Sequence, residues 1–325
     1  MNRKKQIITF VVLGLVLIFI IITYVFYIPS LKRNSHKFSS KYPFLNPAAA
    51  LIDQGDLLVG FQPLRGSLRQ KYENRDDYLI SLYFEYLPTG SNISVNKDEE
   101  IWPASLIKIP VAMAAMKKIE DGEWHLDNEL VISDEDKDDE FGELYQKPTG
   151  TTMSIEEFLR ASLVNSDNTA HFVLLRNLDD AELEEVYIHL GLDDIIEVLK
   201  KSPEAESLNN QITAKRYSVF FRSLYNSTFL TPKYSQKFLD ILKEAPKEYL
   251  SGGLPEEMAF VHKTGIRTDE AVYADAGIVY APGRPYLLTA MVQKKDKTAP
   301  VQNAEIEKLF GEISKEIYDY VSQTK

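Results

Sequence analysis

The chain has 325 residues, 44% of them hydrophobic and none of them cysteine. This composition excludes a disordered chain, and the lack of cysteine excludes disulfides, thiolate metal sites and a catalytic cysteine. The length allows one large domain or two smaller ones. The formal net charge is −11, and because residues 1–41 hold seven basic and no acidic side chains, the remainder carries 30 basic against 48 acidic groups. Such an acidic body argues against nucleic-acid binding, which needs basic patches.

Residues 7–28 contain no charged side chain. At about 1.5 Å per residue this stretch is long enough to cross a bilayer as a helix. The sequence that follows it, YIPSLKRNSHKF, offers no small-x-small cleavage site. We therefore predict a short cytoplasmic N-terminus (1–5), an uncleaved transmembrane anchor (6–28) and a juxtamembrane linker (29–60). Basic residues flank both ends of the anchor, and those after it are expected to meet lipid headgroups.

The patterns from residue 61 to 325 predict one α+β domain. Alternating, aromatic-rich residues 77–87 (DYLISLYFEYL) indicate a strand, and an alanine-rich apolar helix follows over 105–122. From about 123 to 250 the patterns are mostly helical, then strands return near 258, before a final amphipathic helix. Strands at both chain ends with helices between them predict an antiparallel sheet packed against a helical middle subdomain.

The acidic stretch DEDKDDEFGE, residues 134–143, invites a comparison with calcium-binding loops. It lacks the glycine position and the ligand spacing of such a loop, so we interpret it as a solvated surface loop. We accordingly expect no metal and no cofactor.

Residues 102–110, WPASLIKIP, place Ser105 three residues before Lys108 at the start of the apolar helix. At this helical spacing the two side chains share one face, so the amine can reach the hydroxyl. Lys108 would accept a proton near neutral pH only with a lowered pKa, which burial and a neighbouring cation both favour. Free backbone N–H groups near the helix start suit a developing oxyanion. A histidine-based serine hydrolase fits poorly, because the chain has no G-x-S-x-G and its five histidines have no triad context.

Two further motifs follow in chain order. VNSDNTA contains Ser166-Asp167-Asn168 between two helical stretches, and HKTG contains Lys263-Thr264-Gly265 on a predicted strand. Taken singly, the first is explained by a helix cap and the second by a strand running into a turn. S-x-x-K alone also occurs by chance in many proteins, but the three motifs in this order and these contexts are not accidental.

Together the motifs resemble those of class A serine β-lactamases and the related penicillin-binding enzymes. The likeness continues through ASLIKIPVAMAAMKKIEDG, LVNSDNTAHFVLLRNL, GGLPEEMAFVHKTG and DAGIVYAPGRPYLLTAMV, and it covers roughly residues 60–325. It implies the same fold that the patterns predict, a sheet from both chain ends packed on a helical subdomain.

The resemblance implies a role for each matching residue. Ser105 would be acylated by a β-lactam or an acyl-D-alanyl-D-alanine-like amide, and Lys108 would help to activate it. Ser166 would pass a proton to the leaving nitrogen, while Asn168 would orient Lys108 and the substrate amide. The other implied roles are carboxylate binding by Lys263 and Thr264, close substrate approach at Gly265, an oxyanion hole of the Ser105 and Ile266 backbone N–H groups, and structural capping by Asp167.

One departure concerns deacylation. Class A enzymes carry an E-x-x-L-N element whose glutamate activates the deacylating water. The nearest stretch here, SPEAESLNNQITAKRY, has Ala205 at the glutamate position, with Glu204 and Glu206 on either side. A one-residue shift would let Glu206 serve; otherwise both glutamates are ordinary surface charges. Tyr145, before the second motif, either lines the cleft or belongs to the core.

Three functions stay open on this basis. The first is a membrane-anchored class A-like β-lactamase. The second is a penicillin-binding, D-alanyl-D-alanine carboxypeptidase-like enzyme of the cell envelope with slow deacylation, and the third is a non-catalytic anchored binding domain. The first two expect a small β-lactam or peptidoglycan-peptide-like substrate. Because such substrates lie outside the cytoplasmic membrane, we expect a single-pass membrane protein with an extracytoplasmic catalytic body.

Overall fold

A computed structural model describes residues 12–16, 60–196, 211–297 and 303–323. Most of the predicted anchor, the linker up to residue 59 and the candidate base Glu206 lie outside these residues. Within the described ranges, no helix combines the length and the apolar character that crossing a membrane requires. The fold described below is that of residues 60–323.

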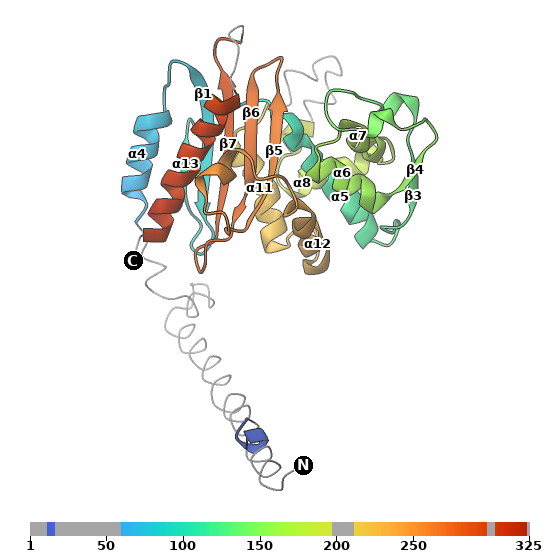
Figure 1. The fold of residues 1–325 in the computed structure, drawn as a ribbon, viewed down its shortest axis with the longest axis horizontal. Helices are drawn as coiled ribbons and strands as arrows, with labels where there is room; N and C mark the ends of the chain where they lie inside the picture. The colour runs from blue at the N-terminus through green and yellow to red at the C-terminus, as the bar shows by residue number, and fades with distance from the viewer. Residues whose placement is uncertain (1–11, 17–59, 197–210, 298–302, 324–325) are drawn as a thin grey trace. The chain divides into compact units, whose positions relative to one another are not determined.

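The centre of the fold is a five-stranded antiparallel sheet with the strand order β2-β1-β7-β6-β5 (Figure 1). Strands β1 and β2 come from the N-terminal part of this region, and the other three come from its C-terminal part. The sheet therefore joins the two chain ends, which confirms the predicted α+β arrangement. The strands are β1 (Tyr78–Tyr86), β2 (Ser91–Val95), β5 (Phe260–Arg267), β6 (Val272–Val279) and β7 (Tyr286–Lys294).

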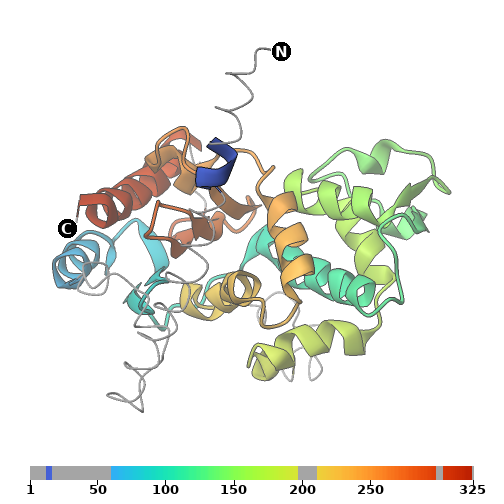
Figure 2. The ribbon, with the colours of Figure 1, turned by 90° about the horizontal axis from the view of Figure 1, so that it is seen from below.

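Helices cover both faces of this sheet. The first and last helices of residues 60–323, α4 (Gln62–Tyr72) and α13 (Asn303–Gln323), lie on one face, as Figure 1 shows. Helix α11 (Ala214–Asn226) packs against β1, β6 and β7 on the other face, where Figure 2 shows it below the strands. Every residue of β6 is buried, since both of its faces are covered.

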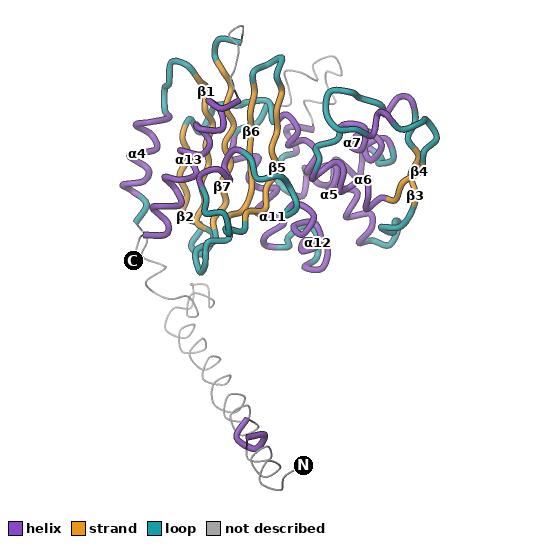
Figure 3. The backbone as a smooth tube through the Cα atoms, in the orientation of Figure 1, coloured by secondary structure: helices purple, strands orange, loops and turns teal. Residues whose placement is uncertain are grey.

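The helical subdomain lies beyond edge strand β5, where Figure 3 shows helices in place of the sheet. Its central helix α5 (Lys108–Glu120) is buried over every residue from Lys108 to Met116, which explains its alanine-rich, uniformly apolar sequence. A small two-stranded sheet, absent from the sequence prediction, adds to this subdomain. The remaining elements are β3 (Glu129–Val131), β4 (Thr152–Ser154), α6 (Ile155–Val164), α7 (Asn168–Arg176), α8 (Asp180–His189) and α12 (Pro232–Leu242), with short 3₁₀ turns η3 (Ala104–Ile107), η4 (Asp134–Asp136), η5 (Leu144–Gln146) and η7 (Tyr249–Gly253).

The predicted helix 105–122 differs from the structure at its start. Ser105 lies on the 3₁₀ turn η3, and the α-helix begins only at Lys108. A 3₁₀ turn has three residues per turn, so the i, i+3 pair still shares a face. Because η3 packs against β5 and β6, the serine is placed at the junction of the sheet and the helical subdomain.

Candidate active site

Ser105 is held on a strained turn. The residue before it, Ala104, is buried and has a φ of 50°, in the left-handed region that costs a non-glycine residue about 1–2 kcal/mol. Ser105 itself is partly exposed between the buried Ala104 and Leu106. Strained backbone of this kind clusters at functional sites, where the surrounding structure enforces it.

Gly265 explains how β5 approaches this turn. A Cβ atom at Gly265 would lie 2.9 Å from the Pro103 carbonyl oxygen and 3.0 Å from the Ser105 nitrogen. These distances are too short for a side chain, so only glycine lets the strand pack directly on η3. The structure thus shows a packing reason for Gly265, and the room for substrate that the resemblance implies there stays a prediction.

Lys108 lies at the centre of a hydrogen-bond network. Its side chain is buried, and its Nζ donates to Ser105 Oγ at 3.2 Å, to the Ser166 carbonyl at 2.6 Å and to Asn168 Oδ1 at 2.6 Å. Burial lowers the pKa of Lys108 to about 7, helped by the charge of Lys263 and opposed by nearby carboxylates. A large fraction of the amine is therefore neutral near pH 7 and able to accept a proton from Ser105.

The Ser166 hydroxyl lies between two lysine amines. Lys108 Nζ donates to Ser166 Oγ at 3.2 Å, and Lys263 Nζ donates to the same oxygen at 3.0 Å. Lys263 is also fully buried on β5, and its Nζ makes a second bond to the Thr264 carbonyl at 2.8 Å. Burial lowers the pKa of Lys263 to about 8, opposed by the charges of Asp275 and Glu248. This pair of amines around one hydroxyl forms a short path for a proton.

Asn168 connects the network to a carboxylate. Its Oδ1 accepts from Lys108, and its Nδ2 donates to Asp138 Oδ1 at 2.7 Å. The orientation of the amide is therefore set from both sides. Asp138 belongs to the acidic stretch interpreted as a solvated loop, and no signal in the sequence placed it at this site.

Asp167 holds the loop that carries Asp138. Its Oδ1 accepts from the Ala170 N–H at 2.8 Å, which caps α7, and its Oδ2 accepts from the N–H groups of Glu143 and Leu144 at 2.7 and 2.9 Å. One buried carboxylate thereby satisfies three backbone donors from two segments. The loop 138–144 is fixed against the second motif as a result.

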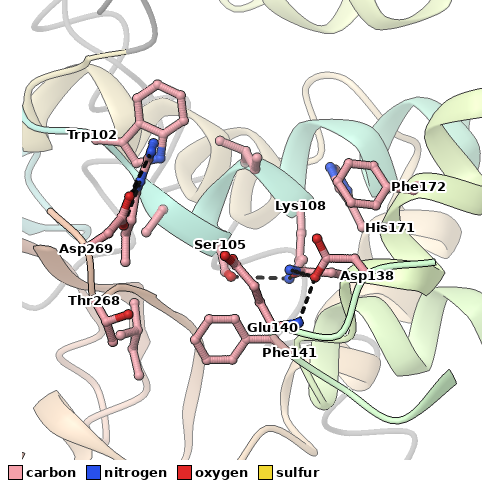
Figure 4. A pocket seen from close by; sticks show the side chains of 15 residues that line it. Trp102, Ser105, Lys108, Asp138, Glu140, Phe141, His171, Phe172, Thr268 and Asp269 are labelled. Carbon is pink, nitrogen blue, oxygen red and sulfur yellow. Dashed lines mark hydrogen bonds and ion pairs between the residues drawn. The ribbon is translucent and has the colours of Figure 1, made fainter. Parts of the chain in front are cut away.

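A pocket of about 560 Å³ opens over Ser105 and Lys108 (Figure 4). Asn168 and Ile266 belong to its wall, whereas Lys263, Thr264, Gly265 and Tyr145 are not among its lining residues. Tyr145 lies on η5, partly exposed, and the aromatic ring that this loop places on the wall is that of Phe141. The sequence analysis also missed several other lining residues, namely Trp102, Asp138, Glu140, His171, Phe172, Arg267, Thr268 and Asp269.

Comparisons with known proteins find β-lactamases. The model of the beta-lactamase enzyme family (Beta-lactamase2) matches residues 67–321. Beta-lactamase VEB-1 of Pseudomonas aeruginosa is 23% identical over 250 residues, which are 70% of this chain and 80% of that protein. Beta-lactamase ROB-1 of Haemophilus influenzae is 28% identical over 159 residues, 49% of this chain and 50% of that protein.

Solved structures show the same fold. The structure of PBP-A matches with a TM-score of 0.68 at 23% identity, covering 81% of this chain and 97% of that one. An ancestral class A β-lactamase matches with a TM-score of 0.65 at 21% identity, covering 80% and 99%. The β-lactamase-like fold predicted from the sequence is thereby confirmed.

Two glycine variants test how much the contact between Asp167 and the loop 138–144 contributes to stability. Gly142 has a φ of +98°, and a Cβ there would overlap the Asp167 carboxylate, while Gly150, with a φ of +88°, has no atom within 4 Å of such a Cβ. Gly150→Ala should therefore cost only the backbone strain, about 1–2 kcal/mol of unfolding free energy. Gly142→Ala should cost a further 1–3 kcal/mol or so from overpacking. Urea unfolding of both variants measures the difference, and equal losses would contradict the proposed role of this contact.

Proposed function

The chain belongs to the beta-lactamase enzyme family, and on that premise we propose that it is a membrane-anchored serine hydrolase that opens β-lactam amides through an acyl-enzyme on Ser105. The observation that carries this proposal is the 3.2 Å contact between Ser105 Oγ and the amine of a buried lysine. Burial lowers the pKa of Lys108 to about 7, so the amine can act as a base at neutral pH.

Acylation follows from these positions. Lys108 takes the proton of Ser105, whose Oγ attacks the amide carbonyl, while the backbone N–H groups of Ser105 and Ile266 receive the developing oxyanion. The proton then passes from Lys108 to the Ser166 hydroxyl, 3.2 Å away, which gives its own proton to the leaving nitrogen. Lys263, charged and within 3.0 Å of Ser166 Oγ, supports that transfer and attracts the substrate carboxylate together with Thr264.

The rate of deacylation distinguishes a β-lactamase from a penicillin-binding enzyme. In the described residues, no carboxylate hydrogen-bonds Ser105 or Lys108 directly, and Asp138 is bonded to Asn168. We assign the activation of water to Glu206, a residue outside the described ranges. If no such group serves, the same acylation machinery belongs to a penicillin-binding enzyme that releases its acyl group slowly.

Intact-mass spectrometry of the full-length protein, purified in a nonionic detergent and mixed with a chromogenic cephalosporin, tests the nucleophile. The wild type should form an adduct on Ser105, and Ser105→Ala should lower acylation by at least about 10³-fold, because no other hydroxyl of the described residues both contacts the Lys108 amine and lines the pocket. Thermal unfolding of the variant provides the control for folding. Acylation of Ser105→Ala at the wild-type rate would contradict the proposal that Ser105 is the nucleophile.

The deacylating group is tested by a matched pair of variants. Many turnovers with little adduct in the wild type would indicate a β-lactamase, and Glu206→Gln should then accumulate the adduct while Glu204→Gln should not. A single burst with a persistent adduct in the wild type would instead indicate a slowly deacylating penicillin-binding enzyme. Equal behaviour of the two variants in a fast wild type would show that Glu206 is not the base.

The acylation rate should depend on pH through both lysines. Lys108 must be neutral to accept a proton, so the rate should fall about tenfold per pH unit below its pKa of about 7. Lys263 must be protonated, so the rate should fall again above its pKa of about 8. Lys263→Arg should remove the alkaline limb, since guanidinium stays charged. A rate constant that is flat from about pH 6 to 9 would contradict these roles.

The uncharged stretch 7–28 supports membrane anchoring. We place the catalytic body outside, because the expected substrates lie outside the cytoplasmic membrane. The protein should therefore stay in the membrane fraction after a high-salt wash and be released by detergent. Protease added to intact spheroplasts should digest residues 60–325 while a cytoplasmic marker protein survives. Protection of this domain would overturn the orientation, and release by salt alone would overturn the anchor.

A further inference from the structure

A buried carboxylate lies behind the strand that carries Lys263. Asp275 on β6 is fully buried, and one of its carboxylate oxygens accepts from the Leu250 N–H at 3.1 Å. The other oxygen lies 2.9 Å from His262 Nδ1 on the neighbouring strand β5. An ionised carboxylate can only accept hydrogen bonds, so the imidazole is the donor in this pair. Neither Asp275 nor His262 has a part in the acylation steps proposed above.

The sheet leaves room for this pair. Gly277 lies directly opposite His262 in the register of β5 and β6, and a Cβ there would lie 2.6 Å from the His262 Cβ. Only glycine therefore admits the imidazole, which stacks on the ring of Phe260 with 4.2 Å between the ring centroids. The second contact of Asp275 comes from Leu250 on η7. Strand β5 and turn η7 thus hold the carboxylate from two sides.

Asp275 and the Lys263 amine lie on opposite faces of the sheet. Successive side chains of a strand alternate between its faces, so Lys263 projects away from the face on which His262 meets Asp275. In the described residues, the Lys263 amine donates to Ser166 Oγ and to the Thr264 carbonyl, and to no carboxylate. The ammonium therefore has no negatively charged hydrogen-bond partner on the side of the active site.

The charge of Lys263 is nevertheless supported from behind the sheet. Burial lowers the pKa of Lys263, and the charge of Asp275 makes the largest contribution that opposes burial, ahead of Glu248. Glu248 is exposed, so water and salt screen its charge, whereas a protein interior screens a buried charge far less. On the side of the active site, the neighbouring titratable group is the amine of Lys108, whose pKa the charge of Lys263 helps to lower.

The other titratable groups around Asp275 do not replace its charge. Burial raises the pKa of Tyr249 on η7 far above its ordinary value, with smaller contributions from Glu248, Tyr273, Asp275 and Glu307, so this phenol is neutral. Burial also raises the pKa of Tyr273. Glu307 on α13 is exposed, as Glu248 is. Of these three carboxylates, Asp275 is the buried one.

We infer that Asp275 is a positioning residue for Lys263: from behind the sheet it keeps the ammonium charged and leaves it free to bind the carboxylate of the substrate. The inference rests on the proposed function, in which Lys263 attracts that carboxylate. A carboxylate hydrogen-bonded to the amine would also keep it charged, but it would compete with the substrate for the same N–H donors. A charge on the opposite face avoids this competition. His262 and Leu250 orient Asp275 and satisfy its oxygens, which have no water to bind.

The pH dependence of acylation by benzylpenicillin tests this role in the full-length protein. The second-order rate constant is measured, because it reports the ionisation of the free enzyme. Asp275→Asn removes the charge, while the amide can still accept from Leu250 and donate to His262 after a change of tautomer. The pKa of Lys263 should then fall from about 8 by roughly one unit. The rate constant should therefore fall about tenfold near pH ~9 and less than about twofold near pH ~6.

Two further variants separate this effect from a structural one. Glu248→Gln removes an exposed charge and should leave the alkaline limb of the pH profile in place. In a Lys263→Arg background the guanidinium stays charged, so Asp275→Asn should add no loss that is confined to alkaline pH. An alkaline limb that Asp275→Asn does not shift, a loss of equal size at every pH, or an equal shift in Glu248→Gln would each overturn the inference.

The wild type provides a test that does not depend on the folding of a variant. Salt at roughly 0.5 M screens exposed charges but not a charge buried behind the sheet, so the midpoint of the alkaline limb should stay in place. A midpoint that fell by about one pH unit would assign the support to exposed charges such as Glu248 and overturn the inference. In all these outcomes benzylpenicillin would still acylate Ser105, so the proposed function would stand. If the wild type were not acylated on Ser105, the proposed function itself would fail.

Discussion

The site depends on the burial of two lysines around one hydroxyl. Water solvates an ammonium ion far better than a protein interior does, so burial lowers the pKa of both Lys108 and Lys263 towards neutrality. The charge of Lys263 further lowers the pKa of Lys108, and Asp275 and Glu248 support the charge on Lys263. One amine is thereby favoured as a base and the other as a cation. The Ser166 hydroxyl can accept from both and donate to a leaving group.

The fold brings these groups together from three separate segments, and two residues of the site have strained backbone conformations. Lys108 starts α5, Lys263 lies on edge strand β5, and Ser166 precedes α7 with a φ of 56°. Together with Ala104, two non-glycine residues at the site have left-handed backbone. Neighbouring contacts offset the strain at each residue. Beside Ala104, β5 packs on η3 through Gly265. Beside Ser166, the Asp167 carboxylate accepts hydrogen bonds from three backbone N–H groups.

The parts of this arrangement that could be predicted are those set by local spacing. Alternation along β1, the apolar run of α5 and the three motifs predict the sheet, the central helix and the Ser105–Lys108 pair. Asp138, His171 and Phe172 could not be predicted, because their place depends on how the loop 138–144 folds back on Asp167. Only the three-dimensional contact distinguishes these residues from a solvated acidic loop and from the core face of a helix.

Acylation and deacylation make different demands on this pocket. Acylation needs a base for a hydroxyl that is already in place, and Lys108 meets that need at 3.2 Å. Deacylation needs a base for a water molecule, which must approach the ester from a side that the leaving group has not occupied. Asp138 is committed to Asn168, and Asp269 is committed to Arg267. These two carboxylates are thus used to orient and to neutralise. In the proposed function, the lifetime of the acyl-enzyme is governed by a group additional to those that form it.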